Sequence, residues 1–382
     1  MSLSLYIHIP WCIRKCPYCD FNSHKSPEKI AENAYVKALL EDFHADLQQF
    51  PAHALTTIFI GGGTPSLFSA QSYADLLEGI DKLLPFSPDI EITLEANPGT
   101  YEQQRFVDYR AVGINRLSLG IQSFNAEKLK QLGRIHNDTQ AQHAITSARR
   151  AGFMNINLDL MHGLPNQTIE EGIQDLQKAL SFEPEHLSWY QLTIEPNTLF
   201  YKKPPVLPNE DSCIAIEEQG LLLLDKHHYQ RYEISAFCHS GQVARHNVNY
   251  WLYGDYYGIG AGAHGKLTDN QLSSYVRTRK YKQPFDYLNP EKSYMAELLQ
   301  LNQKELIFEF MLNTTRLEQA IPNALFTERT GLDFLLLKPL LLQAEAKGLL
   351  ALQDTHWQIT PFGRRFTNDL QALFLLDQEN LS

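Results

Sequence analysis

Three cysteines near the start of the chain have the spacing of ligands for an iron–sulfur cluster. Cys12, Cys16 and Cys19 lie close together and make up three of the five cysteines in the sequence. Thiolates are the usual ligands of a [4Fe–4S] cube, which normally takes four of them. Three closely spaced cysteines would therefore leave one iron open to chelation by a small molecule. The short apolar run Leu5–Ile9 predicts a strand that ends at this cysteine loop.

Two other interpretations of these cysteines are weaker. Free cysteine is common as a small buried residue, but chance does not readily place three such thiols together beside Pro10 and Pro17. A zinc site needs four ligands, usually from paired Cys-x2-Cys or Cys/His units. The two remaining cysteines, Cys213 and Cys238, are distant in the sequence. The spacing therefore favours the cluster.

A second motif, Gly61-Gly-Gly-Thr-Pro65, directly follows a predicted strand. Glycine adopts backbone conformations that are closed to other residues, so such a run can bring backbone N–H and C=O groups against a ligand. A simple turn would explain the run equally well if it stood alone. Its place at the same strand end as the cysteine loop favours a role in ligand binding.

The elements that would position these motifs alternate between strand and helix patterns in the first half of the chain. The predicted strands are short and mostly rich in Ile, Leu, Val or aromatic residues: Ser4–Ile9, Thr56–Ile60, Glu91–Glu95, Arg116–Ile121, Asn155–Leu160 and His186–Thr193. Helical spacing falls between them, for example at Glu32–Gln48, Ala70–Leu84, Glu102–Val112 and Thr139–Ala151. This α/β alternation predicts a parallel sheet, because parallel strands need crossover connections. Periodicity does not choose between an open sheet and a partial barrel, but both place their sites at the carboxyl ends of the strands.

The pattern changes in the second half. The proline-rich connection Lys202–Pro208 cannot sustain a helix, and a predicted helix at Asp211–His227 and a predicted strand at Tyr232–Phe237 follow it. The last part of the chain predicts a small, mostly helical, winged-helix-like module from Glu305–Leu312, Ala320–Thr330, Leu335–Lys347 and Leu349–Thr360. We therefore divide the chain into a core at 1–235, a connecting region at 236–296 and a C-terminal domain at 297–382.

Composition and charge limit the classes of function. The chain has 382 residues, 43% of them hydrophobic and 20% charged, which is ordinary for a globular protein. The net charge of −11 argues against a surface that binds phosphate backbones, so we do not expect the winged-helix-like module to bind nucleic acid. Few cysteines, no signal-peptide pattern and no spanning apolar stretch predict a cytoplasmic protein.

The two motifs together resemble those of the radical S-adenosylmethionine (SAM) superfamily. Further segments narrow the resemblance to the branch that contains oxygen-independent coproporphyrinogen III dehydrogenase and the heme chaperones of the HemW family: Tyr6–Cys12, Gly61–Pro65, Leu94–Pro98, Leu119–Phe124, Asp159–Pro165 and His246–Trp251. The resemblance implies a partial, six-stranded (β/α) barrel. It also implies that the three cysteines hold a [4Fe–4S] cluster and that the amino and carboxylate groups of SAM chelate the open iron.

The resemblance further implies roles for individual residues. Cys12, Cys16 and Cys19 match the cluster ligands, and the contacts of the cluster-bound SAM match Tyr6, Gly62 or Gly63, and Glu95. In the dehydrogenase, a second SAM is lined by positions that match Tyr18, Thr64, Gln122, Arg134 and Asp159. An ordinary polar residue at a strand end is the alternative for each, and a solvated surface role explains Arg134 nearly as well. Apolar strand residues flank Glu95, Gln122 and Asp159, so burial would demand a partner and favours a ligand.

One departure from the dehydrogenase pattern bears on function. That enzyme has a fourth cysteine two residues after the third, where this chain has Phe21. A phenylalanine can serve neither as a thiolate nor as a hydrogen donor, which argues against coproporphyrinogen decarboxylation. The pattern resembles that of the heme chaperones instead, and it leaves cluster binding untouched.

The segment His246-Asn-Val-Asn-Tyr-Trp251 is then the predicted heme site. A neutral imidazole at His246 is a natural axial ligand for heme iron. The rings of Tyr250 and Trp251 could pack against a porphyrin, and Arg245 could pair with a propionate. A core histidine within an aromatic cluster is the alternative. Two further candidate ligands are His8 and His264.

The resemblance implies heme trafficking, in which the protein binds heme and delivers it to apo-hemoproteins, with respiratory proteins at the membrane as expected acceptors. Two enzymatic alternatives remain: hydrogen abstraction from a porphyrinogen propionate by a 5′-deoxyadenosyl radical, and methyl transfer to heme with ring opening. The sequence leaves open whether SAM is cleaved, how many SAM molecules bind, which histidine ligates heme, and whether the chain forms a homodimer.

Overall fold

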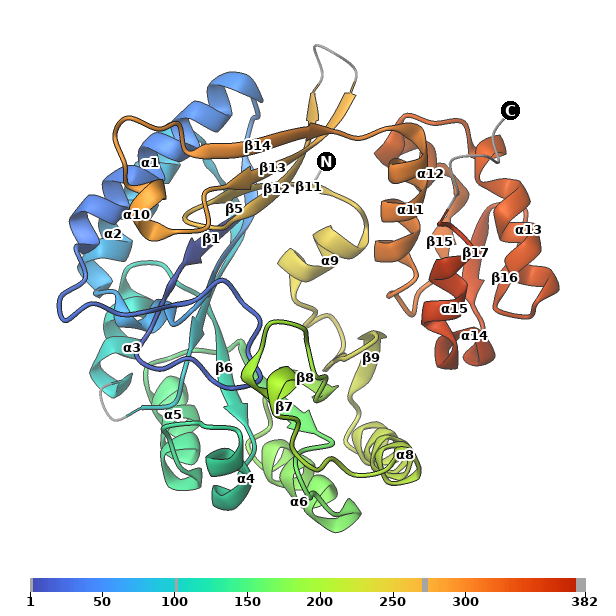
Figure 1. Ribbon diagram of the computed structural model, residues 1–382, viewed down its shortest axis with the longest axis horizontal. Helices are drawn as coiled ribbons and strands as arrows, with labels where there is room; N and C mark the ends of the chain where they lie inside the picture. The colour runs from blue at the N-terminus through green and yellow to red at the C-terminus, as the bar shows by residue number, and fades with distance from the viewer. Residues whose placement is uncertain (1–2, 100–101, 270–273, 376–382) are drawn as a thin grey trace.

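The computed structural model describes residues 3–99, 102–269 and 274–375. Its main feature is a curved sheet of twelve strands in the order β14-β13-β12-β11-β1-β4-β5-β6-β7-β8-β10-β9. Helices cover the outer side of this sheet, and the C-terminal domain lies beside it (Figure 1). Within the described residues the two end strands, β14 and β9, do not pair, so the sheet is a partial barrel.

The centre of the sheet consists of six strands that follow one another in sequence and in space: β1 (Leu3–Ile9), β4 (Leu55–Gly62), β5 (Phe86–Ala96), β6 (Arg116–Gln122), β7 (Ile156–His162) and β8 (His186–Gln191). Neighbouring strands pair in parallel, with Ser4 opposite Thr57 and Leu94 opposite Leu117. The predicted α/β class and the six parallel strands are therefore confirmed.

Helices make the crossovers that parallel strands need. They are α1 (Glu32–Gln49), α2 (Ala70–Leu83), α3 (Glu102–Ala111), α4 (Ala126–Gln131), α5 (Asp138–Arg150) and α6 (Ile169–Leu180). Local signals fix where two of them begin: Asn137 with Gln140, and Thr168 with Glu171, form capping boxes at α5 and α6. Because helices cover the sheet, β6 is buried along its whole length.

Short elements shape the loops at the carboxyl ends of the strands. The cysteine loop lies between β2 (Trp11–Cys12) and β3 (His24–Lys25), which pair with each other. A single turn of 3₁₀ helix, η1 (Pro65–Leu67), follows the glycine motif, and α7 (Leu199–Lys202) follows β8. The helix predicted after the proline-rich connection is α8 (Glu210–Lys226).

The second half of the chain extends the same sheet at both ends. Beyond β8, the strands β10 (Ala236–Cys238) and β9 (Gln230–Glu233) pair antiparallel. Beyond β1, β11 (Asp255–Ile259) pairs in parallel, and β12 (His264–Asp269), β13 (Ser274–Lys280) and β14 (Met295–Gln300) then pair antiparallel. The described residues of the region 236–296, which we expected to be a connection, thus supply four strands, the start of β14 and two helices, α9 (Arg245–Trp251) and α10 (Pro284–Tyr287).

The strand predicted at Tyr232–Phe237 differs from the structure, where the chain turns back near Ser235 and forms the two short strands β9 and β10. The sequence pattern does not reveal the reversal, because Tyr232, Ile234 and Ala236 alternate with more polar residues as they would in a single strand.

The C-terminal domain has a hydrophobic core of its own, in which Phe310, Phe326, Leu341 and Trp357 are buried. Its helices are α11 (Gln303–Thr314), α12 (Asn323–Thr330), α13 (Lys338–Ala346), α14 (Pro361–Arg365) and α15 (Thr367–Ala372), with the 3₁₀ turn η2 (Phe334–Leu336). Three short strands, β15 (Ile321–Pro322), β17 (His356–Ile359) and β16 (Leu350–Leu352), form a small sheet. In the residues that the structure describes, no helix has the length and apolar character needed to cross a bilayer.

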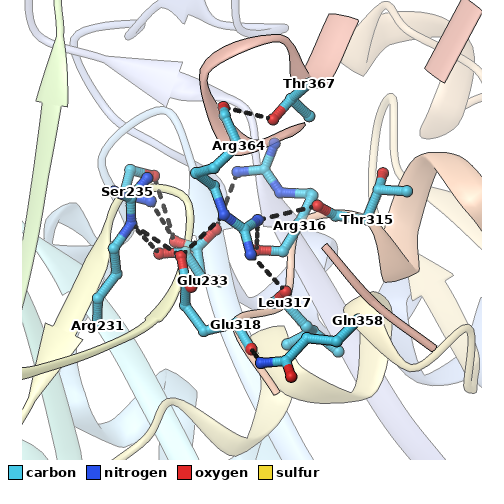
Figure 2. A network of polar contacts seen from close by, with 10 residues as sticks. All are labelled: Arg231, Glu233, Ser235, Thr315, Arg316, Leu317, Glu318, Gln358, Arg364 and Thr367. Carbon is cyan, nitrogen blue, oxygen red and sulfur yellow. Dashed lines mark hydrogen bonds and ion pairs between the residues drawn. The ribbon is translucent and has the colours of Figure 1, made fainter. Parts of the chain in front are cut away.

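A network of paired charges joins this domain to the main sheet (Figure 2). Nη2 of Arg316 donates to Oε2 of Glu233, in β9, at 3.0 Å. Oε1 of Glu318 lies 3.3 Å from Nε of Arg231, also in β9, and 3.0 Å from Nε of Arg364. The backbone N–H of Glu318 donates to the carbonyl of Tyr232. The C-terminal domain is therefore fixed against the edge strand of the sheet.

Replacement of Arg364 by methionine should lower the free energy of unfolding. Its guanidinium donates to three backbone carbonyls, those of Thr315, Arg316 and Leu317. Each of these three acceptors left unpaired costs about 1–3 kcal/mol, and the low end applies because Arg364 is only partly buried, so we expect a total loss of about 3–4 kcal/mol, measured by urea denaturation. Arg365→Met, at the exposed neighbouring position, is the control and should cost less than about 0.5 kcal/mol. Equal effects of the two variants would contradict this role of Arg364.

Candidate functional site

The carboxyl ends of the parallel strands open into a cavity of about 470 Å³. The two sequence motifs meet there, because the cysteine loop and the glycine motif follow neighbouring strands. The lining residues that sequence analysis named are Cys12, Tyr18, Cys16, Cys19, Gly62, Gly63, Thr64, Glu95, Gln122, Arg134, Asp159 and Trp251. Parallel strands end at one edge of a sheet, which explains why residues so far apart in the sequence share one wall.

The three motif cysteines are free thiols, and polar donors accompany two of them. Oγ1 of Thr64 donates to Sγ of Cys12 at 3.5 Å, and Nη1 of Arg134 donates to Sγ of Cys16 at 3.8 Å. Burial raises the pKa of the Cys12 and Cys19 thiols. Hydrogen-bond donors and a nearby positive charge act in the opposite direction, because they favour the thiolate form.

The cysteine loop fits a four-iron cluster. A cube attaches each thiolate to a different iron, so the three sulfurs need not converge on one point. In the described part of the chain, no group of three His, Cys, Asp or Glu side chains is placed to hold a single metal ion. Donors to cluster sulfurs are among the features that set cluster properties, and Thr64 and Arg134 are in place to act in this way.

The glycine motif serves chain packing as well as ligand access. The backbone N–H groups of Gly63 and Thr64 donate to the carbonyls of Ile9 and Trp11, and that of Gly62 donates to Oε2 of Glu95. A Cβ atom at Gly63 would lie 2.5 Å from the oxygen of Trp11. Gly62 and Gly63 line the cavity, so the contact of this motif with a ligand stays a prediction, although other parts of the protein already pair these three N–H groups.

Two buried carboxyl groups give the cavity its electrostatic character. Burial, and next the nearby charge of Asp159, raise the pKa of Glu95 to about 8. Burial also raises the pKa of Asp159, although Asn157 and Ser118 donate hydrogen bonds to its two oxygens. Such shifts in a cavity are typical of functional sites. A ligand with positive charge or hydroxyl donors would favour the ionised form of both groups.

Two further lining residues, Gln122 and Arg134, are held in place by hydrogen bonds within the protein. Gln122 has a φ of 68°, a left-handed conformation that is costly for a non-glycine residue and is common at functional sites. Its Oε1 accepts a hydrogen bond from the Tyr190 hydroxyl at 3.0 Å. Arg134 is not a solvated surface residue: Nη2 donates to Oδ1 of Asn97 and to the carbonyl of Gly120, both at 2.6 Å.

One residue matched to SAM contacts lies outside the cavity wall. Tyr6, in β1, is not among the lining residues. Its hydroxyl is hydrogen-bonded to Nδ1 of His8 at 2.9 Å, and its ring stacks on Phe59 with centroids 6.3 Å apart. Tyr6 thus supports the end of β1, and its contact with SAM stays a prediction.

The predicted heme ligand His246 lies in the protein core. It is 1% exposed, and both ring nitrogens are engaged: Nδ1 with Oγ1 of Thr57 at 2.9 Å and Nε2 with the Tyr250 hydroxyl at 2.6 Å. Burial lowers the pKa of His246 to about 3. As placed, the ring cannot reach iron without losing both partners, which corresponds to the core-histidine alternative. Tyr250 packs against His246 and Tyr256.

The other side of the same segment does face the cavity. Asn247 and Trp251 line it, and the guanidinium of Arg316 lies over the Trp251 ring, 4.3 Å from the centroid. The C-terminal domain therefore supplies part of the wall. Of the two further candidate ligands, His8 has both nitrogens engaged, with Tyr6 and with the carbonyl of Asn22, whereas His264 is exposed on β12.

Several lining residues escaped sequence reasoning: Asn97, Ser118, Ser188, Tyr190, Asn247 and Arg316. Asn97 and Asn247 lie within segments that we quoted for the family resemblance, so a reading of those segments residue by residue would have found them. Tyr190 lies at the end of β8, where strand ends already predicted a site. No sequence signal marks Arg316, because domain docking alone brings it to the cavity.

Comparisons with known proteins agree with the fold and with the family resemblance. Residues 6–179 match the Radical SAM superfamily and residues 301–366 match the HemN C-terminal domain. The chain is 50% identical to the heme chaperone HemW of Haemophilus influenzae and 48% identical to that of Escherichia coli, in both cases over 98% of each chain. The solved structure of coproporphyrinogen III oxidase (HemN) from Escherichia coli aligns with a TM-score of 0.81 at 22% identity, over 98% of this chain and 90% of that one, which shows the shared fold.

Replacement of His246 by alanine should destabilise the protein. The change removes a buried ring and leaves the hydroxyls of Thr57 and Tyr250 without this partner. We expect the free energy of unfolding to fall by about 2–4 kcal/mol, measured by urea denaturation. His264→Ala removes an exposed ring and should cost less than about 0.5 kcal/mol. A His246→Ala variant as stable as the His264→Ala variant would contradict the core placement.

Proposed function

The chain belongs to the HemW family of heme chaperones within the radical SAM superfamily, and on this basis we propose that it binds heme and delivers it to apo-hemoproteins. The observation that carries the proposal is the high identity over nearly the whole length, domain for domain, to two proteins of that name. The acceptors would include respiratory hemoproteins at the membrane.

We propose that a [4Fe–4S] cluster and SAM are its resident cofactors, held in the cavity at the strand ends. When bound, such a cluster can supply an electron to a sulfonium compound that chelates its open iron. The residues of the chain have separate tasks: Cys12, Cys16 and Cys19 provide the thiolates, and Thr64 and Arg134 stabilise the negative charge on sulfur. Glu95 and Asp159 would accept hydrogen bonds from the ligand.

Phe21 supports the chaperone over the dehydrogenase. It lines the cavity, its side chain is 57% exposed, and it stands where the dehydrogenase has a fourth cysteine. A phenyl ring adds apolar surface at the rim and cannot deliver a hydrogen atom or a proton. The exposed position thus suits contact with an apolar cargo better than participation in radical chemistry.

The cysteines agree with a reducing compartment. All five are free thiols, and we propose that the protein works in the cytoplasm. Light scattering on the preparation used for the heme titration measures whether the chain forms a homodimer.

Heme binding is the direct test. We expect anaerobic titration of the cluster-reconstituted protein with hemin to show saturable, near-stoichiometric binding in the Soret band. An unrelated acidic protein of similar size serves as control. Incubation with SAM, a reductant and coproporphyrinogen should leave the porphyrinogen unchanged. Heme binding no tighter than that of the control, or conversion of the porphyrinogen, would favour the enzymatic alternative.

SAM binding should strengthen as pH rises towards about 8. Because the apo protein holds Glu95 protonated below a pKa of about 8, a ligand that needs the ionised carboxylate must first displace the proton. The dissociation constant should therefore fall by up to about tenfold per pH unit between about pH 6 and 8, and then level off. We expect isothermal titration calorimetry to show that the dissociation constant for SAM no longer depends on pH in the Glu95→Gln variant. The Glu127→Gln variant, changed at an exposed helix position, should keep the pH dependence of the wild type. A pH-independent wild type would refute the assignment.

A further inference from the structure

A second cavity, of about 480 Å³, adjoins the first one at the cysteine loop. The two share five lining residues, Arg14, Cys16, Thr64, Asn97 and Arg134. The wall of the second cavity combines apolar side chains with positive charge: Ile13, Leu67, Pro98, Ile135, Arg14 and Arg105.

His136 lines this second cavity and carries a free ring nitrogen. Its side chain is 4% exposed, and Nε2 donates to the carbonyl of Ile121 at 3.1 Å. In the neutral ring the proton is therefore on Nε2, and Nδ1 keeps a bare lone pair. That Nδ1 is buried and has no hydrogen-bond partner in the structure. Burial lowers the pKa of His136 to about 3, so the ring stays neutral at physiological pH.

His136 differs in this respect from the other buried histidines of the described chain. Both ring nitrogens are engaged in His8, His186 and His246. Nδ1 of His162 is also unpaired, but His162 lines neither this cavity nor the first one. Among these five buried histidines, only His136 both has an unpaired ring nitrogen and lines a cavity large enough for a ligand.

The charges of the second cavity oppose those of the whole chain. Its lining contains three arginines, Arg14, Arg105 and Arg134, and neither Asp nor Glu, although the net charge of the protein is −11. Arg105 is anchored by a hydrogen bond to the carbonyl of Ser66, and Arg14 is exposed. The lining therefore suits a ligand with a broad apolar body and anionic groups.

We infer that this second cavity receives the heme, with Nδ1 of His136 as the axial ligand of the iron. The apolar side chains would pack on the porphyrin, and Arg14 and Arg105 would pair with the propionates. The lone pair of Nδ1 forms the bond to iron, and no proton has to leave because Nε2 carries it. Side chains cover Nδ1, so entry requires movement at the rim, where Ile13 and Ile135 are 59% and 60% exposed. This inference rests on the proposed function.

The test is a hemin titration of the full-length, cluster-reconstituted chain, with His136→Gln as the main variant. Glutamine keeps an amide donor for the Ile121 carbonyl and removes the imidazole. We expect at least tenfold weaker binding, a shifted Soret band and loss of the imidazole-ligated signal in electron paramagnetic resonance. His143→Gln, at an exposed position of α5, is the matched control and should bind as the wild type does. Thermal unfolding and SAM binding report whether His136→Gln keeps its fold.

A second variant makes the test independent of His136. Ile135→Glu places a negative charge at the exposed rim, and we expect at least tenfold weaker binding without a change in thermal unfolding. Wild-type affinity and an unchanged spectrum for His136→Gln, or wild-type affinity for Ile135→Glu, would overturn the inference and leave the proposed function standing. If the wild type itself fails to bind heme saturably, the proposed function falls first.

Discussion

The close contact between the ends of β1 and β4 is the constraint on which the site depends. Gly63 and Thr64 donate backbone hydrogen bonds to Ile9 and Trp11, so the glycine motif continues the pairing of the two strands into the cysteine loop. The distance from a hypothetical Cβ of Gly63 to the Trp11 oxygen, 2.5 Å, leaves no space for any other residue. This contact brings Thr64 within hydrogen-bond distance of Cys12. The glycines thus fix the position of the first thiol before any ligand is present.

Arg134 links the two cavities by charge. It contacts Cys16, Asn97 and Gly120, and its side chain lines both spaces. The first cavity contains Glu95 and Asp159, whose pKa values are raised mainly by burial. In the second cavity, the arginines are the charged residues of the lining, which contains neither Asp nor Glu. The inferred heme and the proposed SAM would therefore share this guanidinium as a neighbour, since it lines both cavities.

Features that depend on a local sequence pattern could be predicted. Contacts between segments that are distant in the sequence could not. Parallel strands, crossover helices and the shared strand edge follow from alternation and from turn residues, and so do the positions of the cysteine and glycine motifs. The burial of His246 does not follow from a local pattern, because its partner Thr57 is 189 positions away. Thr57 becomes a neighbour only when α9 packs against β4. Arg316 likewise reaches the cavity through domain docking. The free nitrogen of His136 depends on a backbone carbonyl, which no side-chain pattern encodes.

A protein that transfers its ligand needs a site that can open, and the apolar residues around the cysteine loop fit that need. Ile13, Phe21 and Ile135 are each more than half exposed, an arrangement that costs free energy in water and commonly marks a binding surface. An enzyme that controls a radical gains from a closed, dry cavity. A carrier gains from side chains at the surface that cover the ligand when it is bound and contact the acceptor when it leaves. On the proposed function, the strand ends would hold the cofactors and the exposed rim would exchange the cargo.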